Sequence, residues 1–178
     1  MVGAKRAVFL DRDGVIVIPE FRDGRSFAPR RVEDFNIYPE APAALARLRA
    51  AGFALVVVTN QPDVAGGLIT SDVLETMHDS LKATLPIDRI EVCTHRNEDR
   101  CECRKPAPGM LLQAADALEL SLETSYMVGD RASDVEAGKR AGCKTVFIDR
   151  YYKNDEQPQV VNHSCGGIVE ATDWILSD

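Results

Sequence analysis

Short apolar runs rich in β-branched residues alternate along the chain with segments whose apolar positions recur at helical spacing. The alternation is typical of a parallel sheet covered by helices on both faces, so we expect a three-layer, Rossmann-like α/β fold. The apolar runs predict strands over residues 7–10, 54–58, 90–93, 125–128 and 145–148. The segments between them predict helices over residues 42–51, 72–85, 108–120 and 133–141.

Two segments show neither the apolar runs of a strand nor the helical spacing of apolar residues. Residues 19–36 and 150–167 are mixed in character, so we expect irregular loops there that shape access to a site at the edge of the sheet. The helix near residue 72 has a local start signal, because Asp72 is followed three positions later by Glu75, as in a capping box. No internal repeat or low-complexity linker interrupts the alternation.

The length and composition fit one globular domain spanning residues 1–178. The 178 residues are 45% hydrophobic, which is enough to build one sizeable core. No apolar run approaches the roughly 20 residues that cross a bilayer, and the first residues lack the cleavage pattern of a signal peptide. We therefore expect a cytoplasmic protein, and a monomer as the base expectation for a chain of this size.

The charge balance narrows the set of partners. With 28 acidic against 21 basic residues the net charge is −7, whereas proteins that bind nucleic acid or anionic membranes use basic surfaces. We therefore expect neither nucleic acid nor a membrane as a partner. A small anionic substrate is compatible with this charge, because a local cluster of lysine, backbone N–H groups and metal can outweigh the global field.

Asp11 and Asp13 directly follow the first predicted strand, in the run Asp11-Arg-Asp-Gly-Val15. Two carboxylates two positions apart can divide the work of a nucleophile and a general acid/base, which splits a difficult hydrolysis into two displacements. Gly14 permits the tight backbone of such a turn. Taken alone, the pair is equally compatible with an exposed acidic turn.

Polar residues also stand at other positions where a strand, or the loop after it, ends. The carboxyl ends of parallel strands meet at one edge of the sheet, where open α/β folds bind ligands, so we expect these residues to converge with Asp11 and Asp13. They are Thr59 with Asn60, Lys105 in a cysteine-rich loop, and Gly129-Asp130-Arg131 with Asp134.

In their order, these motifs resemble those of the haloacid dehalogenase superfamily of phosphatases. Its first motif reads Asp-x-Asp-Gly-Thr/Val after a strand, as residues 11–15 do, with Val15 in place of the more common Thr. Thr59 corresponds to the second motif, Lys105 to the third, and residues 129–134, Gly-Asp-x-x-x-Asp, to the fourth. The resemblance implies the three-layer fold of that superfamily, and the short chain implies that no large cap domain covers the site.

The resemblance also implies a role for each motif residue. Asp11 would be the nucleophile that forms an aspartyl-phosphate, and Asp13 would be the general acid/base. Thr59 and Lys105 would hold the phosphoryl oxygens, with Lys105 also offsetting the charge between the phosphate and Asp11. Positioned charges of this kind account for most of the catalysis in phosphoryl transfer.

A magnesium ion is part of the implied mechanism, because Mg²⁺ prefers oxygen ligands. The family pattern supplies the carboxylates of Asp11 and Asp130 and the backbone carbonyl of Asp13, together with phosphate and water. Asp134 would fix the loop around the metal rather than bind it directly.

Three of the five cysteines fall close together and bracket a histidine. Cys93, His95, Cys101 and Cys103 offer four ligands suited to a tetrahedral Zn²⁺ site. Because four protein ligands leave no open position, we expect the zinc of this loop, residues 93–103, to be structural. The alternative is a set of free thiols beside an incidental histidine.

The cysteine loop and the Cys-Arg-Lys-Pro run that closes it narrow the resemblance to heptose 1,7-bisphosphate 7-phosphatases and histidinol-phosphate phosphatases. Residues 53–61, 103–112 and 125–130 are closer to the heptose group. That resemblance implies a small sugar phosphate as substrate, D-glycero-D-manno-heptose 1,7-bisphosphate, which loses its 7-phosphate. It also implies that Asn60 and Arg104 contact substrate or phosphate.

Other interpretations stay open. Gly66 stands where the heptose group usually has arginine, and the short cysteine loop also resembles the histidinol-phosphate group. DNA 3′-phosphatases share similar Thr-Asn-Gln and Arg-Lys-Pro patterns, but the acidic charge balance and the cysteine loop argue against that activity. A non-catalytic, zinc-stabilised binding module is the remaining alternative, and the intact pair of Asp11 and Asp13 argues against it.

Overall fold

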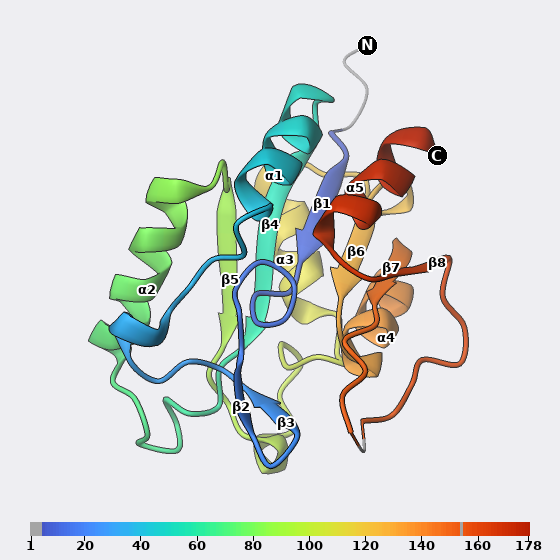
Figure 1. Cartoon of the computed structure of the whole chain (residues 1–178). Coiled ribbons are helices and arrows are strands. Elements are labelled where there is room, and N and C mark those ends of the chain that lie inside the picture. The colour runs from blue at the N-terminus through green and yellow to red at the C-terminus, as the bar shows by residue number, and fades with distance from the viewer. Residues whose placement is uncertain (1–4, 154) are drawn as a thin grey trace.

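The computed structural model of the protein describes residues 5–153 and 155–178 (Figure 1). Within these residues, no helix combines the length and the apolar character needed to cross a membrane. Short 3₁₀ turns lie at η1 (Val32–Asp34), η2 (Asn97–Asp99) and η3 (Leu122–Thr124). The other elements are β1 (Ala7–Leu10), β2 (Glu20–Arg22), β3 (Arg25–Phe27), α1 (Ala41–Ala50), β4 (Ala54–Asn60), α2 (Ser71–Thr84), β5 (Arg89–Cys93), α3 (Gly109–Leu118), β6 (Tyr126–Gly129), α4 (Ala132–Ala141), β7 (Lys144–Ile148), β8 (His163–Cys165) and α5 (Ile168–Ser177).

One six-stranded parallel sheet organises the molecule, with the strand order β5-β4-β1-β6-β7-β8. Numbered by their sequence within this sheet, the strands read 3-2-1-4-5-6, the order of doubly wound α/β folds. The chain winds outward from β1 through β4 to β5, then returns to the other side of β1 and winds outward from β6. The predicted parallel α/β fold is confirmed. Such folds bind ligands at the switch point, here between β1 and β6.

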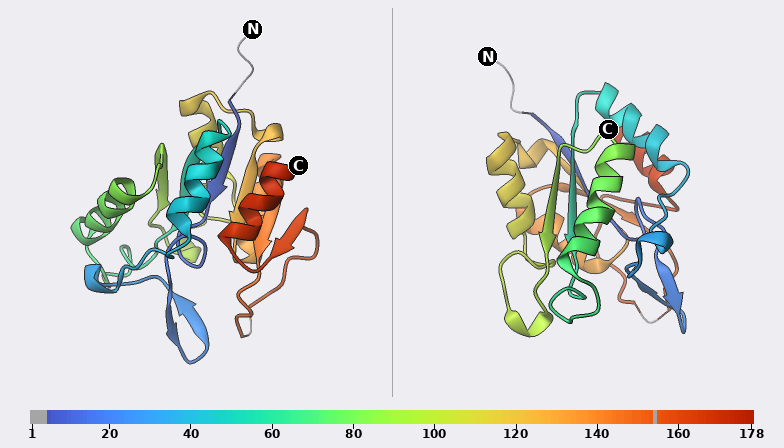
Figure 2. Two further views of the ribbon diagram at one scale, coloured as in Figure 1. Left: turned by 45° about the horizontal axis from the view of Figure 1, so that its top comes forward. Right: turned by 90° about the vertical axis from the view of Figure 1, so that its left-hand side faces the viewer.

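Alternate residues of the central strands pack on opposite faces of the sheet. In β1, Val8 and Leu10 pack with α1, α5 and the end of α2, whereas Ala7 and Phe9 pack with α3 and α4. All four side chains are fully buried. Figure 2 shows the sheet between these two helical layers. Covering both faces explains why the central strands read as nearly continuous apolar runs.

Residues 19–36 and 150–167, which were expected to be irregular, contain strands. β2 and β3 form an antiparallel hairpin in which Phe21 lies opposite Ser26, and β8 adds the last parallel strand beside β7. Each of these strands is three residues long, too short for an alternation of apolar and polar positions to mark it. Between β1 and α1 the chain forms this hairpin and the turn η1.

The start of α2 differs from the predicted capping box. Thr70 occupies the N-cap in an extended conformation, and its hydroxyl accepts a hydrogen bond from the N–H of Val73 at 3.3 Å. Asp72 lies inside the first turn, where its charge faces the positive end of the helix dipole. The cap was therefore predicted two residues too late, although every predicted helix and strand ends within two residues of its observed bounds.

His78 of α2 is buried against the turn that follows β1. The side chain is 8% exposed, and its Nε2 lies 3.1 Å from Nη1 of Arg12, a residue that is 0% exposed. Burial first, and then the charges of Arg12 and Lys82, lower the pKa of His78 to about 4. The folded protein therefore keeps His78 neutral, as an acceptor for the Arg12 guanidinium.

We predict that replacing His78 with Gln makes the protein less sensitive to mild acid. The unfolded state binds a proton on His78 below pH 6.5 and the folded state only near pH 4, so stability is lost as the pH falls through that window. Between pH 6.5 and 4.5 the wild type should lose about 2 kcal/mol more than H78Q. Urea unfolding at several pH values measures this difference, with His163→Gln in β8 as the control. Parallel pH profiles for wild type and H78Q would contradict it.

Candidate active site

A cavity of about 380 Å³ lies at the carboxyl ends of the central strands. Segments far apart in the sequence wall it: residues 26–28 at the end of the hairpin, residues 60–63 after β4, and the start of α4. The charged residues in its lining are Asp11, Asp13, Asp63, Arg104, Lys105, Arg131 and Asp134. The structure thus gathers most of the residues that the motifs singled out.

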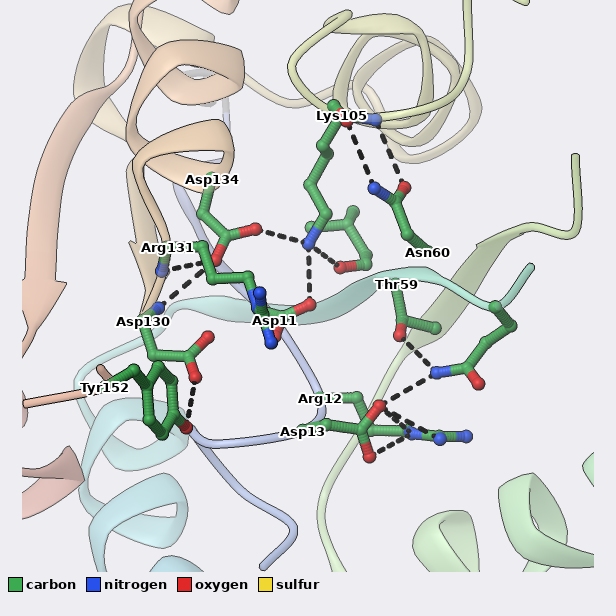
Figure 3. A network of polar contacts seen from close by, with 12 residues as sticks. Asp11, Arg12, Asp13, Thr59, Asn60, Lys105, Asp130, Arg131, Asp134 and Tyr152 are labelled. Atoms are coloured by element: carbon green, nitrogen blue, oxygen red, sulfur yellow. Dashed lines mark hydrogen bonds and ion pairs between the residues drawn. The ribbon is translucent and has the colours of Figure 1, made fainter. Parts of the chain in front are cut away.

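Lys105 links two carboxylates at the floor of the cavity (Figure 3). Its Nζ donates to Oδ1 of Asp11 at 2.6 Å and pairs with Oδ1 of Asp134 at 2.7 Å. It also donates to the carbonyl of Val58 in β4 at 2.8 Å, so each of its three protons has an acceptor. Burial by itself lowers the pKa of Lys105, but Asp11 and Asp134 outweigh burial and raise that pKa above its ordinary value. Lys105 is therefore held as a cation.

Asp11, directly after β1, is 8% exposed. Burial raises the pKa of this carboxyl to about 6, the charge of Lys105 opposes the rise, and Asp134 and Asp13 add to it. The nearby ammonium group thus keeps Asp11 ionised at neutral pH despite its burial. Because Lys105 binds Oδ1, the second oxygen of Asp11 is the one available to a ligand in the cavity.

Asp134 supports two parts of the site at once. Its Oδ2 accepts the backbone N–H groups of Asp130 and Arg131, each at 3.1 Å, which caps the start of α4, while its Oδ1 pairs with Lys105. Gly129 makes this approach possible, because a Cβ at residue 129 would lie 2.1 Å from the Cβ of Asp134. The Gly-Asp-x-x-x-Asp spacing therefore has a steric reason.

Asp130, at the end of β6, has the chemistry of a cation ligand. It is 3% exposed, and one of its oxygens lies within 4.8 Å of an oxygen of Asp11 and one of Asp134. Burial first, and then these two charges, raise the pKa of Asp130 well above its ordinary range. Its Oδ2 accepts a hydrogen bond from the Tyr152 hydroxyl at 2.6 Å, and its buried Oδ1 has no hydrogen-bond partner among the described residues. Clustered carboxylate oxygens with a free acceptor fit a hard cation such as Mg²⁺.

Asp13 is oriented by two neighbouring side chains. Nε and Nη2 of Arg12 lie 3.1 and 3.0 Å from its Oδ1 and Oδ2. Nε2 of Gln61 donates to Oδ2 of Asp13 and to Oγ1 of Thr59, each at 2.9 Å. Thr59 is 1% exposed and lies behind Gln61 rather than in the cavity lining. Its expected contact with a phosphoryl oxygen stays a prediction.

Asn60 and Arg104 line the cavity and are both engaged by the protein. The Asn60 amide clamps the loop that carries Lys105, because its Nδ2 donates to the Lys105 carbonyl and its Oδ1 accepts the Lys105 N–H, each at 3.1 Å. Arg104 donates to Oδ1 of Asn97 at 2.6 Å and to the carbonyl of His95 at 3.3 Å. Both acceptors of Arg104 are neutral. Contact of Asn60 and Arg104 with substrate stays a prediction.

Cys93, His95, Cys101 and Cys103 gather where β5 ends. The Cys93 and Cys101 sulfurs lie 3.6 Å apart, those of Cys101 and Cys103 3.5 Å apart, and Nδ1 of His95 is 3.6 and 3.3 Å from Sγ of Cys93 and Cys103. Sulfurs bound at 2.3 Å to one tetrahedral centre lie about 3.8 Å apart, so these distances are close to the edges of such a tetrahedron. The cluster therefore fits Zn²⁺.

Among the side chains at the site that had no role in the sequence analysis are Arg12, Gln61 and Tyr152, each of which contacts a motif residue. Arg12 stands between the two motif aspartates, and Gln61 directly follows Asn60, so adjacency to motif residues was an available signal. Tyr152 lies in the loop after β7, away from every motif, and no spacing in the sequence connects it with Asp130.

Heptose 1,7-bisphosphate phosphatases are found both among the curated relatives and among the similar solved structures. A family model described as HAD-hydrolase-like matches residues 102–160. The D-glycero-beta-D-manno-heptose-1,7-bisphosphate 7-phosphatase of Helicobacter pylori (strain J99) is 33% identical, over 98% of this chain and 99% of that protein. The protein of that name from Escherichia coli (strain K12) is 34% identical, over 96% and 88%. The crystal structure of D,D-heptose 1,7-bisphosphate phosphatase from B. bronchiseptica, complexed with magnesium and phosphate, is 28% identical with a TM-score of 0.82, over 97% and 98%.

We predict that the chain holds about one zinc ion and that Cys101→Ser releases it, because the closed set then loses one of its four ligands. Elemental analysis should show zinc near zero in C101S, and the melting temperature should fall because the loop loses its cross-link. Cys165→Ser is the control, since Cys165 is equally half-buried and lies at the opposite edge of the sheet. Equal zinc content in C101S and C165S would refute the assignment.

Proposed function

Because the chain belongs to the family of D-glycero-beta-D-manno-heptose-1,7-bisphosphate 7-phosphatases, HAD-like hydrolases, we propose that it removes the 7-phosphate of that heptose bisphosphate through an aspartyl-phosphate on Asp11. The observation that carries the proposal is the buried Lys105, bound to Asp11 and Asp134 at the floor of the cavity that also contains Asp13. The relatives are named for the beta anomer, which favours that anomer here.

In the first step, Oδ2 of Asp11 attacks phosphorus and the bond from phosphorus to the C7 oxygen breaks. Lys105 holds the other oxygen of Asp11 at 2.6 Å, and its charge offsets the repulsion between carboxylate and phosphate. That charge acts in a buried site, where it is worth far more than in water. Asp13, in its protonated form, donates its proton to the leaving C7 oxygen.

In the second step, water attacks the phosphorus of the aspartyl-phosphate and the bond to the Asp11 oxygen breaks. Asp13, now ionised, accepts a proton from that water, and inorganic phosphate leaves. Arg12 and Gln61 both bind the Asp13 carboxyl group, so they keep it in one orientation for the two proton transfers. The side chains around Asp13 thus serve both halves of the cycle.

We assign Mg²⁺ to the carboxylates of Asp11 and Asp130, with the backbone carbonyl of Asp13 as the family resemblance implies. When bound, the cation neutralises charge on the phosphoryl oxygens. The buried Oδ1 of Asp130, which has no hydrogen-bond partner within residues 5–153 and 155–178, supports this assignment. The crystal structure of the B. bronchiseptica relative is complexed with magnesium and phosphate, which supports magnesium as the cation.

A basic concavity beside the main cavity offers a place for the second phosphate of a bisphosphate. Its volume is about 240 Å³, and it shares Arg104 and Lys105 with the main cavity. Arg100 and Arg140 also line it, with Arg140 paired to Glu136 at 2.8 Å, and its described lining itself contains no carboxylate. Guanidinium groups recognise phosphate through paired, charge-assisted hydrogen bonds, so we assign the 1-phosphate to this concavity.

We propose that the cysteine loop binds a structural zinc ion that fixes Arg104 at the wall of the cavity. Arg104 directly follows the ligand Cys103, and it donates to the carbonyl of the ligand His95. The closed ligand set leaves no position for water or substrate on the metal. The zinc therefore acts on specificity through the position of the loop.

Histidinol phosphate is the competing substrate, because it would need the same carboxylates and the same loop. It carries a single phosphate, so the basic concavity favours the heptose bisphosphate. Cleavage of DNA 3′-phosphates is disfavoured by the net charge of −7, which opposes association with a polyanion. The cytoplasmic location and the monomeric state stay predictions from the sequence.

The proposal is tested by phosphate release, with magnesium and with EDTA, from heptose 1,7-bisphosphate, histidinol phosphate and a 3′-phosphorylated DNA oligonucleotide. The ratio of kcat/KM values reports differential binding of the transition states. We expect the heptose bisphosphate to be preferred by several orders of magnitude. Preference for another substrate would reassign the pathway, and no magnesium-stimulated release from any of them would refute the phosphatase activity.

We predict that Asp11→Asn abolishes turnover and preserves the fold, because the amide keeps the shape of the side chain and lacks the attacking oxygen. The loss in kcat should be at least about 10³-fold, as for other covalent nucleophiles. Steady-state kinetics and thermal melting measure the two effects, with the exposed Asp79→Asn as the control. Turnover of D11N within tenfold of the wild type would exclude Asp11 as the nucleophile.

We predict that Arg104→Ala impairs hydrolysis of the bisphosphate more than that of heptose 7-phosphate, which lacks the distal phosphate. Loss of a charge-assisted hydrogen bond should lower kcat/KM for the bisphosphate by about 10- to 100-fold. The matched control is Arg47→Ala, an arginine of α1 that pairs with Asp173 away from the cavity. Equal losses for both substrates would show that Arg104 does not bind the distal phosphate.

A further inference from the structure

The loop after β7 turns one tyrosine outward and the next one inward. The side chain of Asp149 accepts a hydrogen bond from the N–H of Tyr151 at 2.8 Å, and Tyr151 has a φ of 56°, in the left-handed region. That conformation is uncommon for a bulky residue, and such residues concentrate at functional sites. Tyr151 is consequently 83% exposed, whereas Tyr152 is 9% exposed and lies against Asp130 (Figure 3).

The Asp130 carboxylate packs against both Tyr152 and the turn after β1. The Tyr152 hydroxyl donates to Oδ2 of Asp130 at 2.6 Å. A Cβ at Gly14 would lie 1.9 Å from that same oxygen and 2.7 Å from the Tyr152 hydroxyl. The position therefore admits only glycine, and Oδ2 packs closely against the backbone of this turn while it accepts the hydrogen bond from the tyrosine hydroxyl.

This contact orients Asp130 without neutralising it. Lys105 binds Asp11 and Asp134, and its three contacts do not include Asp130. A tyrosine hydroxyl is a neutral donor, so the hydrogen bond to Oδ2 adds no positive charge beside Asp130. Among the described residues the buried Oδ1 of Asp130 has no partner. One oxygen is thus fixed and the other is left free.

The ring of Tyr152 is held by residues that also shape the cavity. The Arg131 guanidinium lies 5.6 Å from its centroid and donates to Oγ of Ser26 at 2.6 Å, and the ring of Phe21 lies 6.0 Å away. Ser26 and Arg131 line the main cavity. These ring contacts do not depend on the hydroxyl, so loss of the hydroxyl alone leaves the tyrosine's packing intact.

We propose that Tyr152 is a positioning residue for a divalent cation: its hydroxyl fixes one oxygen of Asp130 so that the other oxygen binds the cation. The inference rests on the proposed function only in taking that cation to be Mg²⁺. Hydrogen bonds that orient metal ligands typically change metal affinity by about 10- to 100-fold when they are removed. Tyr152 acts through Asp130 and makes no contact with the phosphate in this assignment.

The test is Tyr152→Phe, which removes the hydroxyl and keeps the ring. MgCl₂ is titrated into the purified full-length protein, and binding is followed by calorimetry and by the rise in melting temperature with MgCl₂ concentration. We expect the half-saturating MgCl₂ concentration to rise by about 10- to 100-fold in Y152F. Tyr151→Phe is the matched control, because Tyr151 is exposed and loss of its hydroxyl should leave magnesium binding unchanged. In the activity assay, kcat of Y152F should recover to nearly the wild-type value at saturating MgCl₂.

Two results would overturn the inference. If Y152F lowers the melting temperature equally with and without MgCl₂ and binds magnesium as the wild type does, the hydroxyl has only a structural role. If Y152F binds magnesium more tightly, the hydroxyl competes with the cation. Weaker magnesium binding in Y152F upholds the inference even if the wild type hydrolyses none of the candidate phosphates, and that last result would count against the proposed function alone.

Discussion

The buried ammonium group of Lys105 is the interaction on which the rest of the site depends. Asp11, Asp130 and Asp134 offer oxygens within 4.8 Å of one another, and like charges so close and so buried repel strongly. Lys105 binds two of these carboxylates, at 2.6 and 2.7 Å, and thereby offsets part of that repulsion. Its removal would leave uncompensated buried charge, which is among the most destabilising changes in a protein. The carboxylate that Lys105 does not reach is Asp130, so the cluster still has room for a further cation.

The parallel sheet explains why so unfavourable a cluster can form. β1 and β6 are neighbours at the switch point, with Leu10 opposite Val128, so the residues that follow both strands emerge side by side. The strand ends cannot separate without exposing a core that is packed on both faces, and each fully buried Leu or Val contributes about 1.5–3 kcal/mol. Hydrophobic burial thus holds the carboxylates closer together than their mutual repulsion would allow in water. Such enforced proximity is the usual origin of shifted pKa values at catalytic sites.

The two candidate metal sites differ in the same way as their proposed tasks. The carboxylate cluster has hard oxygens, one of them without a partner in the part of the chain that the structure describes, which suits a cation that must also bind substrate oxygens. The cysteine cluster offers soft ligands and already supplies all four positions of a tetrahedral site, which suits a cation that only holds a loop. The carboxylates proposed to react therefore lie at rigid strand ends. The walls of the cavity come from the cysteine loop and the β2–β3 hairpin. A family can change such loops, and with them its specificity, without disturbing the core.

Local periodicity and short spacings were enough to predict the central strands and helices, the convergence of Asp11, Lys105 and Asp130, and the cysteine cluster, because parallel strand ends must share one edge of a sheet. The hairpin and β8 escaped prediction because three-residue strands carry no periodicity. Local patterns could not predict which carboxylate oxygens lack a hydrogen-bond partner. The partner of Asp130 is Tyr152, from a loop whose direction depends on a left-handed turn at Tyr151 and on its return across the end of β6. Hydrogen bonds between residues distant in sequence are settled by packing in three dimensions, so only the folded chain could decide that one oxygen of Asp130 is held and the other is open.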